Sequence, residues 1–264
     1  MKENLSIEFE NDAFKGWVDE SIAIVKVKCN AFYSLINIDM SRIVLNWFDR
    51  VSEYNNLNVI LFLNEKGCFG NTAYEVFVTE LTGKDIKNGS KNILSEYDLI
   101  QVRSKEINIL NSFIRATVTY KRLVVSGLNG TIVTPFFGAS LASNFRFATE
   151  DSKIAFSHVK YGIHASGALP FYLPKYIGMG KATEYIFEGG ELTVQDAYKL
   201  GLISKIFTSQ NFETECIKEA KRLSSLGSRY LSWTKHLLIR HNEELINYLH
   251  DEEKYIDKYK NINR

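Results

Sequence analysis

The sequence predicts a layered α/β fold in which short buried strands alternate with helices. Residues Asn58 to Leu63 form a continuous apolar run, which is typical of a strand covered on both faces. The preceding segment, Met40 to Val51, carries apolar side chains at helical spacing. Before it, Ile22 to Val27 has the β-branched content and period-two character of a strand. This β-α-β order indicates a layered core with helical crossovers.

Composition and charge limit the classes of partner. Hydrophobic residues make up 45% and charged residues 24% of the 264 residues, with only 3 prolines, so the chain is neither disordered nor of low complexity. The 32 Lys and Arg side chains nearly balance the 31 Asp and Glu side chains. A net charge of +1 provides no global basic field for nucleic acid or an anionic membrane. We therefore expect neither partner.

The compartment follows from the N-terminus and the cysteines. The first ten residues are polar and lack a signal-peptide apolar run, and no window reaches the roughly 18 apolar residues of a membrane span. Cys29, Cys68 and Cys216 are odd in number and widely spaced. They predict reduced thiols in a cytoplasmic protein, without a disulfide framework or a metal site.

The N-terminal elements are separated by turn residues. Leu5 to Phe9 is predicted as a strand preceding the one at Ile22 to Val27. Asn11, Asp12 and Gly16 supply turn chemistry between the two strands. After the buried strand at Asn58 to Leu63, the glycines of the segment 67–70 end the extended run.

The middle of the chain contains a long polar connection. Gly83 to Ser95 is rich in Lys, Asn, Gly and Ser, which favours a surface loop. Ile107 to Val118 is predicted as a helix, and Leu123 to Ser126 as a buried strand. Gly127 and the Asn129-Gly130 pair end that strand.

The remaining elements are predicted in the same way. A strand–loop–helix unit is expected over Thr134 to Ser143, followed by two short strands at Phe145 to Ala148 and Ile154 to Phe156. From Ala168 the pattern is mostly helical, with Thr193 as the N-cap of a helix that Gly201 ends. From residue 212 onward the chain is predicted to be helical and amphipathic, with a break at 227–228.

Several short motifs, taken together, carry a resemblance to a known family. They are Cys68 to Ala73, Leu128 to Gly130, Asn144 to Ala148, Ser152 to Phe156, Leu173 to Gly178 and Leu192 to Ala197. This series resembles the crotonase (enoyl-CoA hydratase/isomerase) superfamily over about residues 20 to 208. Each motif alone would be weak, and their order along the chain is what makes the likeness specific.

The resemblance implies a fold, a substrate class and an assembly. The fold would be a crotonase-like spiral of β-β-α units over residues 1–207, with a C-terminal helical region over 208–264 that packs trimers, often paired into hexamers. The substrate would be an acyl thioester of coenzyme A or of an acyl carrier protein. Coenzyme A or phosphopantetheine would arrive as part of the substrate, and no further cofactor or metal is implied.

The family holds the thioester oxygen with two backbone N–H groups, which stabilise a developing oxyanion. By resemblance the first donor is the backbone N–H of Asn71. Gly70 and Ala73, in the same segment, would contact the substrate. The second donor position falls on Pro135, and proline has no N–H. Either Pro135 starts a helix whose next residue, Phe136, or Phe137 supplies the N–H, or the oxyanion hole is broken.

The family's two catalytic carboxylates fall on Gly138 and His158. Water addition needs an acid and a base around one water, so ordinary hydration is disfavoured. His158 is a candidate acid–base group because the pKa of a free histidine lies near neutrality, and its alternative is a structural histidine. Glycine at the first position is familiar from relatives that dehydrate or decarboxylate thioesters during polyketide β-branching.

Five further residues are weaker candidates. By resemblance to the decarboxylating relatives, Lys87 or Lys84 would bind a departing carboxylate and His250 would be catalytic, although lysines in a polar loop and histidines on a helix surface are more often solvated. Tyr74 would donate to a substrate oxygen or pack, and His164 would line the pocket or serve as a loop histidine.

Two functions of different classes follow. The first is a lyase that handles an acyl thioester through an oxyanion-stabilised enolate, by dehydration or decarboxylation more than by hydration. The second is a catalytically impaired homologue that binds thioesters or serves as a scaffolding subunit, which Pro135 and Gly138 together favour. Isomerisation and thioester hydrolysis form a weaker third option.

Overall fold

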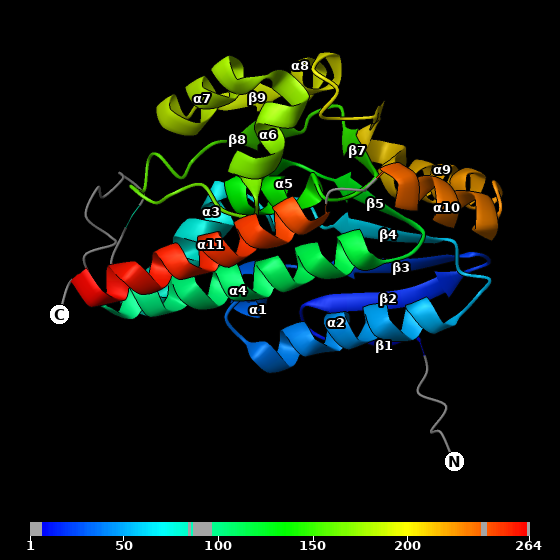
Figure 1. Ribbon diagram of the computed structural model, residues 1–264, viewed down its shortest axis with the longest axis horizontal. Coiled ribbons are helices and arrows are strands. Elements are labelled where there is room, and N and C mark those ends of the chain that lie inside the picture. Colours follow the sequence, from blue (N-terminus) through cyan, green and yellow to red (C-terminus); the bar gives the residue numbers. More distant parts are fainter. Residues whose placement is uncertain (1–6, 84–85, 87–96, 239–241, 263–264) are drawn as a thin grey trace.

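A computed structural model, shown in Figure 1, describes residues 7–83, 86, 97–238 and 242–262. It contains a seven-stranded sheet of order β1-β2-β3-β4-β5-β7-β10. Strands β3, β4, β5, β7 and β10 run parallel, and β1 and β2 join as antiparallel strands at one edge. The strands are β1 (Phe9–Glu10), β2 (Phe14–Asp19), β3 (Ile22–Val27), β4 (Val59–Asn64), β5 (Leu123–Leu128), β7 (Phe145–Thr149) and β10 (Lys205–Phe207).

A second sheet has three strands in the order β6-β8-β9, namely β6 (Thr131–Val133), β8 (Lys153–Ala155) and β9 (Glu191–Thr193). The chain alternates between the two sheets. Strand β5 is followed by β6 and helix α5 (Thr134–Ser140), and β7 is followed by β8 and helix α6 (Leu169–Ile177). Each unit therefore adds one strand to each sheet before its helix, which is the predicted spiral of β-β-α units.

The other helices cover the sheets and form the C-terminal region. They are α1 (Ala31–Ser34), α2 (Ile38–Glu53), α3 (Asn71–Thr82), α4 (Tyr97–Thr119), α7 (Met179–Glu188), α8 (Val194–Lys199), α9 (Phe212–Ser224), α10 (Ser228–Leu238) and α11 (Asn242–Ile262). Helices α4 and α11 run side by side in Figure 1. Arg115 of α4 forms an ion pair with Glu253 of α11 at 2.8 Å.

Strand β4 shows why the large sheet has two apolar faces. Its residues alternate in direction, so Leu61 packs with α9 while Ile60 packs with α2. Trp47 of α2 and Cys216 of α9, on opposite sides of the sheet, are both 0% exposed. The continuous apolar run predicted for this strand is therefore the signature of helices on both faces.

Two of the sequence predictions differ from the structure. Gly16 lies inside strand β2, where the ring of Phe9 covers it, and is not a turn residue. The Asn11 turn is present, since its Oδ1 accepts the backbone N–H groups of Ala13 and Phe14. Helix α4 begins at Tyr97, ten residues before the predicted start at Ile107.

The loop predicted over Gly83 to Ser95 lies almost wholly outside the described residues. Within the described part of the chain, no helix combines the length and apolar character needed to cross a bilayer.

A buried lysine links stability to pH. Lys235 of α10 is 4% exposed, and its Nζ donates to the carbonyls of Thr117 and Arg122 at 3.2 and 2.8 Å. Burial lowers the pKa of Lys235 from 10.5 to about 7. Between these two values the unfolded chain holds a proton that the folded chain has released, so the free energy of unfolding rises with pH in this window.

We predict that Lys235→Met removes this dependence between pH 7 and pH 10. The loss of slope would be at most about 1.4 kcal/mol per pH unit. Urea unfolding at pH 7, 8 and 9 measures it. Lys218→Met, on the exposed side of α9, is the control and should leave the slope unchanged. An unaltered slope in the Lys235 variant would show that this lysine keeps its proton in the folded protein.

Candidate active site

The starts of helices α3 and α5 are held next to each other. The backbone N–H of Val133, the N-cap of α5, donates to the carbonyl of Phe69 at 2.9 Å. Gly70, the N-cap of α3, is extended with φ −89° and ψ 170°. The N–H of Asn71 therefore lies in the first turn of α3, where N–H groups have no partner inside the helix. The structure brings together the two segments that the resemblance assigned to oxyanion binding.

Pro135 occupies the second position of helix α5. Proline is tolerated in a first helical turn because the N–H that it lacks has no partner there. The first N–H able to bond back within this helix belongs to Phe137, which leaves the N–H of Phe136 free of an intrahelical acceptor. Pro135 thus lies in the first turn of α5, one position later in the helix than predicted, and the next residue, Phe136, keeps an N–H donor.

His158 is buried and hydrogen-bonded through both ring nitrogens. Its Nδ1 lies 2.8 Å from Thr134 Oγ1, and its Nε2 lies 2.8 Å from the carbonyl of Ile186. A carbonyl only accepts, so Nε2 carries the hydrogen and Nδ1 accepts from the Thr134 hydroxyl. Burial lowers the pKa of His158, which favours this neutral ring. Proton transfer by His158 would first require one of these bonds to break.

Gly138 is enclosed by backbone. A Cβ added there would lie 2.5 Å from the carbonyl oxygen of Gly167 and 3.0 Å from the backbone nitrogen of Leu169. The space that a carboxylate side chain would need is occupied by the segment leading into α6. The fold therefore leaves no room at Gly138 for an acid–base group.

A small pocket lies at the start of α5, and several of the candidate residues line it. It has a volume of about 20 Å³, and Tyr74, Thr134, Pro135, His158 and Tyr161 are among its lining residues. That volume suits one water molecule. Burial raises the pKa of Tyr74, so its hydroxyl stays protonated at neutral pH.

Arg103 also lines this pocket and was not among the residues singled out from sequence. It is 4% exposed and pairs with Glu106, with Nη1 to Oε2 at 3.0 Å. Its Nη2 donates to the carbonyl of His164 and to Ser166 Oγ. Burial raises the pKa of Glu106, and the nearby guanidinium opposes that rise. The sequence does contain a signal for this pair. An Arg and a Glu three residues apart lie next to each other on a helix and can form an ion pair.

The remaining predicted residues lie elsewhere. His164 contributes its carbonyl to Arg103, while burial lowers the pKa of its ring to about 3. Its Nε2 is buried without a hydrogen-bond partner among the residues that the structure describes. His250 is exposed on α11. Lys84 and Lys87 lie outside the described residues.

Comparison with known proteins decides the family. The sequence profile of the enoyl-CoA hydratase/isomerase family matches residues 81–263. The chain belongs to this family. Solved structures share the fold of this chain. An enoyl-CoA hydratase from Bacillus halodurans superimposes with a TM-score of 0.76 at 18% identity, covering 94% of each chain. An enoyl-CoA hydratase/isomerase from Cupriavidus metallidurans CH34 gives 0.69 at 19% identity, over 94% of this chain and 89% of that one.

Curated relatives of this crotonase-family chain are distant. Peroxisomal enoyl-CoA delta isomerase 3 of Mus musculus is 24% identical over 78% of this chain and 67% of its own length. Enoyl-CoA delta isomerase 2 of Rattus norvegicus is 24% identical over 68% of this chain and 47% of its own length. The 4-chlorobenzoyl coenzyme A dehalogenase-2 of Arthrobacter sp is 22% identical over 67% of each. The chain thus spans about half to two thirds of the length of these relatives.

Proposed function

We propose that this protein is an enzyme that binds an acyl thioester of coenzyme A at the paired starts of α3 and α5. The observation that carries the proposal is the hydrogen bond from Val133 to Phe69, because it sets the N–H groups of Asn71 and Phe136 at the ends of adjoining helices. Fixed donors beside a thioester oxygen stabilise the charge of an enolate. The dipole of α3 adds to the donor at Asn71.

The side chain of Asn71 supports a ligand of this kind. Its Oδ1 is buried and has no hydrogen-bond partner among the described residues. Such an acceptor costs free energy until a donor reaches it. The pantetheine arm of coenzyme A carries two amide N–H groups, and either would satisfy the oxygen beside the proposed thioester position.

The reaction proposed is one that forms the enolate without adding water. Gly138 has no space for a carboxylate, and both nitrogens of His158 are bonded, so an acid–base pair for hydration is missing from these two positions. Decarboxylation needs no base. The electrons of the breaking C–C bond move into the thioester, carbon dioxide leaves, and the enolate then takes a proton. The Tyr74 hydroxyl is the proposed proton source, and solvent returns its proton.

Dehydration makes a larger demand on the site than decarboxylation. It requires a base for the proton next to the carbonyl. The lone pair of His158 is on Nδ1, so the ring must release the Thr134 hydroxyl to act as that base. Both reactions suit the glutaryl-type thioesters of polyketide β-branching, which acyl carrier proteins also present. Decarboxylation is therefore the first reaction to test, on both carriers.

The test is a substrate screen with the purified protein. Glutaconyl-type thioesters on coenzyme A and on an acyl carrier protein are assayed for release of carbon dioxide, and 3-hydroxybutanoyl-CoA is assayed for loss of water. Crotonyl-CoA is assayed for hydration. We expect release of carbon dioxide and little hydration. Hydration of crotonyl-CoA as the fastest reaction would contradict the proposed chemistry.

A second function is a subunit that binds thioesters without turnover. The absence of an N–H at Pro135 and the fully bonded ring of His158 favour it. Calorimetry separates the two functions, because the second predicts tight binding of acyl-CoA with no product from any substrate in the screen.

We also propose assembly with further copies of the chain, as a homotrimer or a hexamer. Helix α10 exposes several large apolar side chains, namely Tyr230, Trp233, Leu237 and Leu238. Exposed apolar patches of this kind mark interaction surfaces. Light scattering should give three or six times the mass of the chain, and a monomer at micromolar concentration would contradict the assembly.

A cytoplasmic location is proposed from the cysteines. Cys29, Cys68 and Cys216 are free thiols, and Cys29 is exposed. Exposed thiols persist where the surroundings are reducing. Fractionation of the source cells tests this location.

A further inference from the structure

We infer that Lys235 is a site at which an apolar aldehyde binds covalently, as an imine of the side-chain amine. The inference goes beyond the proposed thioester chemistry and does not depend on it. Lys235 lines a cavity of about 360 Å³ between α10, α6 and the segment 141–145 that follows α5. Among the described residues, none lines both this cavity and the small pocket beside His158.

The hydrogen bonds of Lys235 suit a neutral amine. Its Nζ donates to the carbonyls of Thr117 and Arg122 at 3.2 and 2.8 Å. A protonated lysine has three N–H hydrogens, whereas the neutral amine has two hydrogens and a lone pair. The two carbonyls therefore accept both hydrogens of the neutral amine and leave its lone pair for attack on an electrophilic carbon.

The surroundings of Lys235 also favour the neutral amine. The residue is 4% exposed, and no Asp or Glu lines the cavity among the residues that the structure describes. The ionisable side chains that line the cavity with it are Tyr172, Tyr176 and Tyr230, and the ring centroid of Tyr120 lies 5.9 Å from Nζ. Burial lowers the pKa of Lys235 to about 7, so slightly above pH 7 most of the folded protein carries the nucleophilic form.

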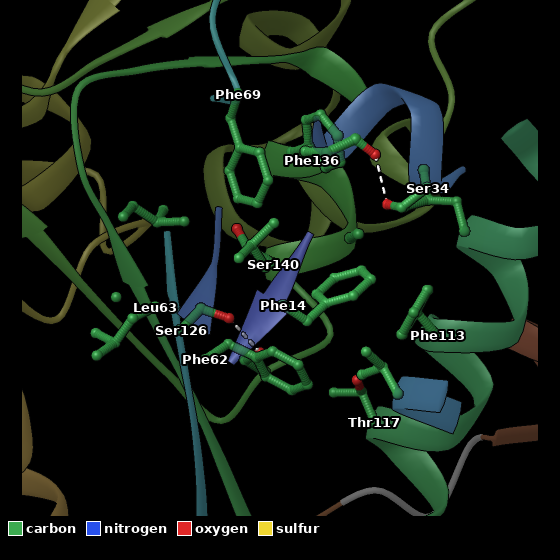
Figure 2. Close-up of a pocket in the computed structure, with 18 of the residues that line it drawn as sticks. Phe14, Ser34, Phe62, Leu63, Phe69, Phe113, Thr117, Ser126, Phe136 and Ser140 are labelled. Atoms are coloured by element: carbon green, nitrogen blue, oxygen red, sulfur yellow. Dashed lines mark hydrogen bonds between the residues drawn. The ribbon is translucent and has the colours of Figure 1, made fainter. Parts of the chain in front are cut away.

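A smaller apolar cavity lacks such a nucleophile. It has a volume of about 120 Å³, and Figure 2 shows Phe14, Phe62 and Phe113 around it. Thr117 lines this smaller cavity and the next residue, Val118, lines the cavity of Lys235, so the last turn of α4 borders both. Among the described residues, no lysine or cysteine lines the smaller cavity. An apolar space is joined to an amine at Lys235 and not there.

Helix α10 presents one face to the larger cavity. Tyr230, Thr234 and Leu238, which follow each other at intervals of four residues, line it. Tyr230 and Leu238 are 59% and 77% exposed, so the cavity reaches the surface at this helix. Trp233 and Leu237 do not belong to the lining and lie on another face of the helix. Assembly through Trp233 and Leu237 would therefore leave the cavity within one chain.

The size and lining of the cavity select the aldehyde. Leu141, Phe145, Leu223 and Leu231 are among the apolar residues that line it. An apolar cavity of about 150 Å³ binds benzene, so a volume of about 360 Å³ suits about twelve carbon atoms. Because Lys235 is the single basic residue in the described lining and is used for the imine, a charged group on the ligand would be buried without a partner. The ligand class is accordingly an uncharged aldehyde with one or two rings, or with an alkyl chain of similar volume.

Imine formation at Lys235 balances without a further reactant. The amine lone pair attacks the aldehyde carbon, and a proton moves from the nitrogen to the aldehyde oxygen, which gives a carbinolamine. The C–O bond then breaks, the oxygen leaves as water with the second proton of the nitrogen, and a C=N bond remains. Apolar walls favour this product because they hold little water for the reverse hydrolysis.

The experiment identifies the lysines that react with 2-naphthaldehyde. The purified protein is incubated at pH 7.5 with the aldehyde and cyanoborohydride, which reduces imines to stable amines, and mass spectrometry locates the modified peptides. At this pH about three quarters of amines with a pKa of about 7 are neutral, against about 0.1% of ordinary lysines. We expect Lys235 to react at least tenfold faster, as an order of magnitude, than the exposed Lys218, which is the internal control.

Two variants of α10 test whether the aldehyde occupies the cavity. Thr234→Phe places a ring in the cavity and should reduce the modification of Lys235 by about tenfold or more. His236→Phe is the matched control, because His236 lies on the same helix outside the lining, and it should keep the modification. Both positions are exposed, so the fold should be retained, and circular dichroism checks this.

Preferential modification of Lys235 that Thr234→Phe prevents and His236→Phe retains supports the inference. If the exposed lysines react first, or if Lys235 reacts equally in the two variants, the inference is overturned and Lys235 serves only to hold the end of α4. Neither result bears on the proposed function, because the assay contains no thioester and the cavity lies apart from the pocket beside His158.

Discussion

Replacing Asn71 by proline should lower thioester turnover by about 100- to 1,000-fold while leaving the fold intact. The substitution removes one N–H from the proposed oxyanion site, and loss of a single donor of this kind has that magnitude. The backbone accepts proline here because Asn71 is the first residue of α3. Gly70 is already extended, with φ −89° and ψ 170°, as the residue before a proline must be.

Asn71→Ala is the matched control for this variant. It keeps the N–H and removes the side-chain amide, whose Oδ1 has no partner among the described residues. We expect its turnover to stay within about tenfold of the parent, since only a hydrogen bond to the ligand is lost. Circular dichroism and thermal melts of both variants show whether the fold is retained.

A readout that is independent of turnover comes from the ligand itself. Acetyl-CoA labelled with ¹³C at the carbonyl should shift downfield on binding, because two N–H donors polarise the carbonyl bond. The shift should shrink in the proline variant and persist in the alanine variant. An equal shift in both variants would show that the Asn71 N–H does not contact the thioester.

The fold could be predicted from the sequence because its signals are local or repeat along the chain. The apolar run of β4, the helical spacing of α2 and the turn at Asn129-Gly130 each depend on neighbouring residues. The helix prediction did not include the first ten residues of α4. A polar stretch precedes them, and the segments that pack against them are distant in the sequence. Arg103 is held by His164 and Ser166, some sixty residues away.

The candidate site could be predicted in part, for the same reason. The positions of Asn71 and Pro135 at helix starts follow from motifs and turn chemistry, and the structure brings these starts together. The hydrogen bonds of His158 could not be predicted from the sequence. One of its partners is a backbone carbonyl, that of Ile186, and any residue there would supply the same acceptor. Sequence patterns therefore carry no signal for that hydrogen bond.

Gly138→Ala should destabilise the protein by about 2 kcal/mol or more, although alanine is the better helix former. The added Cβ would meet the carbonyl oxygen of Gly167 at 2.5 Å and the nitrogen of Leu169 at 3.0 Å. Both are backbone atoms, which cannot rotate away as the end of a side chain can. Gly167 itself has φ +71° and lies against the carbonyl of Pro135, so movement of that segment is costly as well.

Gly180→Ala is the control for helical glycines. Gly180 lies in α7 with nothing within 4 Å of an added Cβ, so the same substitution should stabilise the protein by up to about 1 kcal/mol. Thermal melts should then move in opposite directions, by several degrees downward for Gly138→Ala and slightly upward for Gly180→Ala.

The outcome at Gly138 bears on the reaction as well as on stability. If Gly138→Ala unfolds more easily, Gly138→Glu must do so too, and the carboxylate that hydration needs cannot be restored by a single substitution. A stable Gly138→Glu variant that hydrates crotonyl-CoA would contradict this account. It would show that the segment from Gly167 to Leu169 yields, and that the site differs from a water-adding enzyme by one side chain.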